Sequence, residues 1–123
     1  MNLPVLRALI VDDDLTISGL MRRCFSAWGW IADESHSVSE ALECFRQGEY
    51  DLALCDVDLP DGNGIILAKA LSKAKPSLRI VVISGNPLNV DRARESGFHR
   101  LQKPFDLDAL KALIDSSLHI VPS

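Results

Sequence analysis

Five short apolar runs alternate with amphipathic stretches along the sequence, and this alternation limits the chain to one class of fold. Repeated strand–helix units predict an α/β protein, a parallel sheet with helices on both faces and right-handed crossovers. The length of 123 residues suits one domain, spanning residues 1–123. The predicted strands are Leu6–Val11, Trp30–Glu34, Asp51–Cys55, Arg79–Ile83 and Phe98–Leu101.

The stretches between the strands carry apolar residues at the spacing of one helix face. The first predicted helix presents Ile17, Leu20, Met21, Cys24, Phe25 and Trp28. The last presents Leu107, Leu110, Leu113, Ile114 and Leu118. Between them, helices are predicted around Val38, Ala41, Leu42 and Phe45, from about Ile65 to Lys73, and from about Asn89 to Glu95.

Short polar residues precede several of these helices. Asp14 and Asp106 are predicted N-caps, and either Ser37 or Ser39 is expected to cap the second helix.

Glycines and turn formers follow some of the helices and strands. Gly29 and Gly48 are predicted to end the first two helices. The segment Leu59–Gly64 is dense in turn formers, and Asp61 within it is interpreted as a turn residue.

Polar side chains follow four of the predicted strands. In open parallel sheets, ligands bind outside the carboxyl ends of the strands, near the switch point in strand order. These side chains are therefore expected to lie along one edge of the sheet. They are Asp12, Asp13 and Asp14 after the first strand, Asp56 after the third, Ser84 after the fourth and Lys103 after the fifth.

Such a set suits phosphoryl chemistry. Converging carboxylates repel one another unless a cation neutralises them, and carboxylate oxygens with a few waters suit Mg²⁺. Lys103 and Ser84 could hold phosphoryl oxygens, which leaves Asp56 as a nucleophile that forms an aspartyl-phosphate. Phosphoryl transfer depends mostly on positioning and charge neutralisation, which this set provides.

In this order and at these separations, four motifs resemble the receiver domains of two-component response regulators, over nearly the whole chain. The resemblance implies a flavodoxin-like (βα)5 fold, doubly wound, with strand order 2-1-3-4-5. The motifs are Leu9–Asp14, Asp56 with Leu59–Gly62 and Gly64, Val82–Gly85, and Lys103–Phe105.

The resemblance also implies roles for the acids. Asp56 matches the phosphoacceptor, and Asp13 matches the direct Mg²⁺ ligand. Asp12 matches the acid that usually holds metal-bound water, and the backbone carbonyl of Asp58 matches the third protein ligand.

Two further positions correspond to groups that contact the phosphoryl group. Ser84 matches the hydroxyl and Lys103 the amine of the family. By the same resemblance, the Lys103–Pro104 peptide bond is expected to be cis, a state that proline makes accessible.

A receiver of this kind takes its phosphoryl group from a histidine kinase or a histidine phosphotransfer protein and regulates an effector domain or protein. It catalyses its own phosphorylation and dephosphorylation and is otherwise no enzyme. The output is a shift in conformational population at the fourth helix, fifth strand and fifth helix. The same surface could form a homodimer.

The chain departs from the family pattern at two positions. Arg100 occupies the switch position, which is usually aromatic, and the segment Gly97–Lys103 is one residue short. The aromatic ring to which Ser84 is usually coupled is therefore expected to be missing, which calls that coupling into question. Asp58 adds a negative side chain near the acceptor, and altered dephosphorylation is expected.

Two other functions compete with this interpretation. A phosphatase-like hydrolase could use Asp56 and Asp58 as nucleophile and general acid, but it would need a longer chain and would leave Asp12–Asp14 without a role. A pseudo-receiver would bind partners without being phosphorylated. The complete acceptor and metal set argues against it, whereas Arg100 favours it.

Composition limits the binding partners and the cellular location that we expect. The formal net charge is −4 and no Lys/Arg cluster forms a stripe, so direct nucleic-acid binding is not expected. No apolar run approaches the roughly 20 residues of a membrane span, and no signal peptide begins the sequence. Three cysteines inside apolar segments predict buried free thiols and a cytoplasmic location: Cys24, Cys44 and Cys55.

The remaining aromatic and imidazole side chains show no ligand-binding pattern. The histidines lack metal-ligand spacing and are interpreted as surface or satisfied residues: His36, His99 and His119. Trp28 and Trp30 flank Gly29 and are expected to pack rather than to stack on a ligand.

Overall fold

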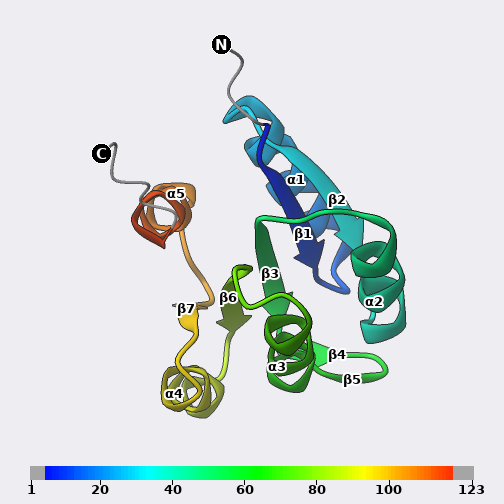
Figure 1. Cartoon of the computed structure of the whole chain (residues 1–123). Coiled ribbons are helices and arrows are strands. Elements are labelled where there is room, and N and C mark those ends of the chain that lie inside the picture. Colours follow the sequence, from blue (N-terminus) through cyan, green and yellow to red (C-terminus); the bar gives the residue numbers. More distant parts are fainter. Residues whose placement is uncertain (1–4, 118–123) are drawn as a thin grey trace.

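A five-stranded parallel sheet forms the centre of the computed structural model, which describes residues 5–117 (Figure 1). Its order, β2-β1-β3-β6-β7, confirms the predicted order 2-1-3-4-5, since β6 and β7 are its fourth and fifth strands along the chain. The strands are β1 (Arg7–Val11), β2 (Ile31–Ser35), β3 (Leu52–Asp56), β6 (Arg79–Ser84) and β7 (His99–Gln102).

Helices cover both faces of this sheet (Figure 1). One face packs against α1 (Leu15–Ala27) and α5 (Leu107–Ser117). The other packs against α2 (Val38–Gln47), α3 (Gly64–Ala74) and α4 (Pro87–Glu95). Within residues 5–117, none of the helices combines the length and apolar character that crossing a membrane requires.

The central strands supply both hydrophobic cores. All five residues of β3 are buried, and alternate side chains point to opposite faces. Ala53 and Cys55 join the core beneath α2, α3 and α4, whereas Leu52 and Leu54 join the core beneath α1 and α5. Burial on both faces explains why this strand is a continuous apolar run.

The helix ends follow local capping chemistry. The side chain of Asp14 accepts hydrogen bonds from the first-turn N–H groups of α1, and that of Asp106 accepts one from the N–H of Ala109. Ser37, and not Ser39, caps α2, because its Oγ accepts the N–H of Glu40.

Glycines follow α1 and α2 as predicted. Gly29 adopts a φ of 91° one residue beyond the C-cap of α1, and Gly48 is the C-cap of α2. A positive φ is costly for residues that carry a Cβ, so the chain turns at Gly29.

Tertiary pairing moved some predicted boundaries. Both edge strands lie one residue later than predicted, because β2 extends to Ser35 opposite Val11, and β7 extends to Gln102 opposite Ser84. The turn-rich segment after β3 also contains a small antiparallel hairpin, β4 (Asp58–Leu59) and β5 (Gly62–Asn63). The predicted helix residue Leu118, and His119, lie outside the described residues.

The prediction of three buried thiols was correct only in part. All three cysteines are free, but only Cys55 is buried. Cys24 and Cys44 are half-buried, and Cys44 packs at the margin of the core under α2. Helical periodicity identified the apolar face of each helix, but it did not show which residues lie at the border of that face and are partly exposed to solvent.

The two tryptophans pack as expected. Both rings make edge contacts with Phe25, each at a centroid distance of 5.4 Å. Of the histidines, His36 pairs with Glu34 and Glu40 at the surface, and His99 is exposed.

Candidate functional site

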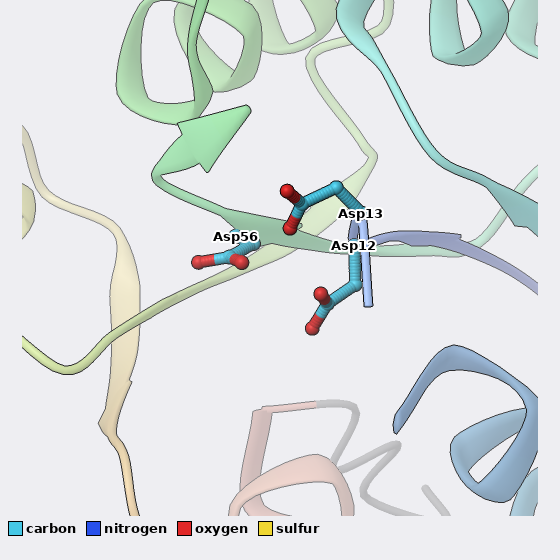
Figure 2. Close-up of side chains that lie close together, drawn as sticks. All are labelled: Asp12, Asp13 and Asp56. Atoms are coloured by element: carbon cyan, nitrogen blue, oxygen red, sulfur yellow. The ribbon is translucent and has the colours of Figure 1, made fainter. Parts of the chain in front are cut away.

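Two adjacent strands bring three carboxylates together at the edge of the sheet. Asp12 and Asp13 directly follow β1, and Asp56 is the last residue of β3. Each offers one oxygen within 4.8 Å of the others, and Figure 2 shows the three side chains grouped together. Asp12 and Asp56 are buried, whereas Asp13 is exposed. The predicted convergence of strand-end acids is therefore present.

Lys103 enters the same group from the segment after β7. Its Nζ lies 3.1 Å from Oδ2 of Asp12 and 3.3 Å from Oδ2 of Asp56. Its backbone N–H donates to the carbonyl of Ser84 at 2.8 Å, and the Lys103–Pro104 peptide bond is cis. One ammonium thus joins carboxylates from two strands, and its own backbone is anchored to a third.

The charges at this edge do not balance. Burial raises the pKa of Asp56 to about 6; the Lys103 ammonium opposes this shift, and the charges of Asp12 and Asp13 add to it. For Lys103, burial disfavours the charged form, but the carboxylates of Asp56 and Asp12 outweigh it and raise the pKa. Three carboxylates face one ammonium, which is a favourable setting for a divalent cation.

The neighbouring thiol does not compete as a nucleophile. Burial, reinforced by the charge of Asp56, raises the pKa of Cys55 to about 12. Because the thiolate is the reactive form, Cys55 remains an inert core residue beside Asp56.

Ser84 ends β6 and is fully buried. Its Oγ accepts hydrogen bonds from the backbone N–H of Asn86 at 3.0 Å and from Nδ2 of Asn89 at 3.4 Å. The predicted site hydroxyl is therefore held from the α4 side, through a residue, Asn89, that the sequence pattern did not single out.

The loop after β3 folds tightly against the end of that strand. A Cβ at Gly64 would lie 1.9 Å from the carbonyl oxygen of Asp56, and the N–H of Gly64 donates to the carbonyl of Val57 at 2.8 Å. Asp58 begins β4 in this loop with an exposed side chain. Gly64 was noted as part of a motif, but this close approach had no sequence signal.

Asp61 has a wider role than the predicted turn residue. Its carboxylate accepts the backbone N–H groups of Val38 at 2.7 Å and Ser39 at 3.0 Å, and these two residues begin α2. These hydrogen bonds hold the pKa of Asp61 below its ordinary value. The β4–β5 hairpin is thereby fastened to the start of α2.

Arg100 lies in the edge strand β7 opposite Val82 and is half-buried. By strand alternation it shares a face with Phe98, which packs against the core beneath α2, α3 and α4. Arg100, which the sequence motifs matched to the switch position, therefore lies on the α4 side of the sheet.

The fold and this site define a class of protein. Residues 8–115 match the response regulator receiver domain family, and the chain belongs to that family. The family indicated by the sequence motifs is thus confirmed, and the chain is a two-component signal transduction receiver.

Similar sequences belong to longer regulators. The chain is 29% identical to the transcriptional regulatory protein ZraR of Escherichia coli O157:H7, over 92% of its own length and 27% of ZraR. It is 32% identical to the DNA-binding transcriptional regulator NtrC of Azospirillum brasilense, over 90% of its length and 24% of NtrC. The chain therefore spans about a quarter of the length of these relatives.

Solved structures of receivers superpose closely. A two-component response regulator from Clostridium difficile has a TM-score of 0.87 at 25% identity, over 96% of this chain and 99% of that one. The response regulator TrrA from Thermotoga maritima, in complex with Mg²⁺ and BeF, has a TM-score of 0.84 at 26% identity, over 93% of this chain and 100% of that one.

Proposed function

We propose that this receiver, residues 1–123, accepts a phosphoryl group on Asp56 from a phosphohistidine, in a Mg²⁺-dependent reaction that it catalyses itself. The donor is a histidine kinase or a histidine phosphotransfer protein, and the result regulates an effector. The observation that carries this proposal is the Lys103 ammonium, which lies within 3.3 Å of both the Asp12 and Asp56 carboxylates at the carboxyl edge of the sheet.

The donor set fits Mg²⁺. Three hard carboxylate oxygens within 4.8 Å of one another leave an excess of negative charge beside one ammonium. Asp13 and Asp56 would bind the ion directly, with the backbone carbonyl of Asp58, and Asp12 would hold a metal-bound water. When bound, Mg²⁺ neutralises charge on the incoming phosphoryl group.

Transfer then follows from the placement of the chain's own groups. A carboxylate oxygen of Asp56 attacks phosphorus, and the bond from phosphorus to the donor imidazole nitrogen breaks. Lys103, already beside Asp56, neutralises one phosphoryl oxygen, and the hydroxyl of Ser84 donates to another. Later attack of water on phosphorus releases inorganic phosphate and restores the carboxylate.

An apolar groove beside Lys103 suits the donor protein. The groove lies between α1 and the segment after β7, with a volume of about 600 Å³, and its lining includes Leu20, Phe105 and Leu107. Because Lys103 also lines it, an apolar helix seated there would bring its phosphohistidine to the edge that holds Asp56. We assign this groove to the helix of the donor that carries the histidine.

The signal leaves through a shift in population toward a second arrangement of α4, β7 and α5. Arg100 replaces the usual aromatic ring on this route, and a homodimer through the same surface stays a prediction. A cytoplasmic location is supported by the three free cysteines, since disulfides are rare in reducing compartments.

The two alternatives are less well supported. A pseudo-receiver would have no need for the ion-paired Lys103 beside a complete acid cluster. The phosphatase interpretation left Asp12 and Asp13 without a role, whereas both lie against Asp56, and the chain belongs to the receiver family.

Intact mass spectrometry tests the proposal. Incubation with acetyl phosphate and Mg²⁺ is expected to add one phosphoryl group to the wild-type chain and none to Asp56→Asn. Glu49, an exposed acid in a loop, provides a control, and Glu49→Gln should be phosphorylated like wild type. A wild-type chain that gains no adduct and does not bind beryllofluoride would support the pseudo-receiver. An adduct retained by Asp56→Asn would place the acceptor elsewhere.

A further inference from the structure

The hydroxyl of Ser84 is held by two donors from the beginning of α4. Its Oγ accepts the backbone N–H of Asn86, the N-cap of that helix, at 3.0 Å. It also accepts the side-chain amide of Asn89 at 3.4 Å, at the long end of the hydrogen-bond range. A fully buried hydroxyl thus receives one hydrogen bond from the helix cap and one from the helix itself.

These two contacts determine what the hydroxyl can still do. A serine hydroxyl has one proton and two acceptor lone pairs. With both lone pairs occupied by the donors of Asn86 and Asn89, the proton is the group that remains for another partner. A phosphoryl oxygen on Asp56 can only accept a hydrogen bond, so it requires the hydroxyl in this orientation.

Asn89 is an unusual residue for the inner face of a helix. It is 8% exposed, and only Asn89 and Ala93 are buried on α4. A buried amide is unfavourable without hydrogen bonds, and an apolar residue would be the ordinary choice for packing. The contact of Asn89 with Ser84 accounts for an amide at this position and links α4 to the site.

We propose that Asn89 is a positioning residue, which orients the Ser84 hydroxyl as a donor to the phosphoryl group on Asp56 and makes α4 sensitive to that group. The inference rests on the proposed function. It supplies a polar route from Ser84 to α4 that does not pass through position 100, where Arg100 stands in place of a ring.

A double-mutant cycle tests the proposal. Affinity for beryllofluoride in saturating Mg²⁺ is measured by titration calorimetry for wild type, Asn89→Leu, Ser84→Ala and the double variant. Leucine keeps the branched shape and heavy-atom count of asparagine but is somewhat larger and cannot donate. Asn89→Leu is expected to weaken binding about fivefold, the equivalent of one ordinary hydrogen bond. In the Ser84→Ala background the same substitution should have no effect, because no hydroxyl remains to be oriented.

Controls separate this role from helix packing. Val90→Ala trims a half-buried neighbour on α4 whose side chain cannot donate, and it should bind like wild type. Asn89→Ala replaces Asn89→Leu in the cycle if the leucine variant does not unfold cooperatively. Equal weakening with and without the Ser84 hydroxyl, or no weakening at all, would overturn the role of Asn89 alone. Failure of the wild-type chain to bind beryllofluoride would overturn the proposed function as well.

Discussion

The Cβ of any side chain at position 64 would lie 1.9 Å from the backbone carbonyl oxygen of Asp56, so the loop after β3 closes against that strand only with glycine there. Gly64→Ala is therefore expected to displace this loop, lower the free energy of unfolding by about 2–4 kcal/mol and abolish phosphorylation. Urea denaturation and intact mass after acetyl phosphate treatment measure the two effects.

Gly19 provides the matched control for this substitution. It lies within α1, and a Cβ there would meet nothing within 4 Å. Gly19→Ala should leave phosphorylation unchanged and raise stability by about 0.5–1 kcal/mol, because alanine loses less backbone entropy in a helix. Equal stability losses in Gly64→Ala and Gly19→Ala would show that the close approach to Asp56 does not cause the loss of stability.

The raised pKa of Asp56 predicts how stability depends on pH when no divalent cation is present. The pKa is about 6 in the folded chain and 3.8 for an ordinary aspartate, so the folded state holds a proton that the unfolded state has lost. Stability should therefore fall as the pH rises from about 4 to about 6, and stay low above that range.

Asp56→Asn removes this titration. The variant should be more stable than wild type at pH 8 by about 1–3 kcal/mol, and the difference should shrink below about pH 4. Urea denaturation in EDTA at several pH values measures the difference. A variant that is no more stable than wild type at pH 8 would contradict the raised pKa of Asp56 in the folded chain.

Removal of the Asp61 carboxylate should loosen the β4–β5 hairpin from α2. Its folded pKa lies below the ordinary 3.8, so its stabilising effect is present above that value and is lost as the pH falls through the folded pKa. Asp61→Ala is expected to lower the unfolding temperature at pH 7, and to lower it by less as the pH falls below the ordinary 3.8, measured by calorimetry.

Glu49 gives a control for Asp61, since it is exposed and makes no hydrogen bond or ion pair with another described residue. Glu49→Ala should leave the unfolding temperature at pH 7 unchanged. The same loss in both variants would indicate a general charge effect rather than the two hydrogen bonds to Val38 and Ser39.

The exposed carboxylate of Asp58 is expected to affect dephosphorylation. It stands two residues after Asp56, the proposed phosphoacceptor, and we expect it to accept a proton from the attacking water. Asp58→Asn should lengthen the lifetime of the aspartyl-phosphate severalfold. The decay of the phosphorylated chain is measured by intact mass after the phosphodonor is removed. Asp58→Glu keeps the carboxylate and should decay more like wild type. An unchanged lifetime in Asp58→Asn would rule out a role of Asp58 in dephosphorylation.

If the groove beside Lys103 binds the donor protein, a substitution in it should slow phosphotransfer from a protein donor but not from a small-molecule donor. Leu20→Asp places a charge in the groove and should reduce phosphotransfer from the cognate phosphohistidine protein while sparing acetyl phosphate. Ile66→Asp, on the exposed side of α3, is the matched control and should spare both. Gel-based transfer assays compare the rates. Equal losses at both positions would argue against this groove as the docking surface.

Much of the fold could be predicted from local sequence pattern. The apolar run of β3 indicated a strand buried on both faces, and its flanking amphipathic segments indicated helices on either side. Asp12, Asp56 and Lys103 could be placed at one edge from the sequence alone, because parallel strands end on the same side of a sheet. The structure then supplied the ion pairs that join them.

Contacts between residues distant in sequence were decided by tertiary structure alone. Asp61 was interpreted as a turn residue, because its pattern with Pro60 and Gly62 does not identify α2 as its partner. Asn89 resembled an ordinary helix residue until packing of α4 brought its amide to Ser84. Periodicity and spacing along the sequence determined which helices and strands form and which strand ends carry reactive side chains. The hydrogen-bond partners between different elements depend on how those elements pack, and no local sequence pattern encodes that packing.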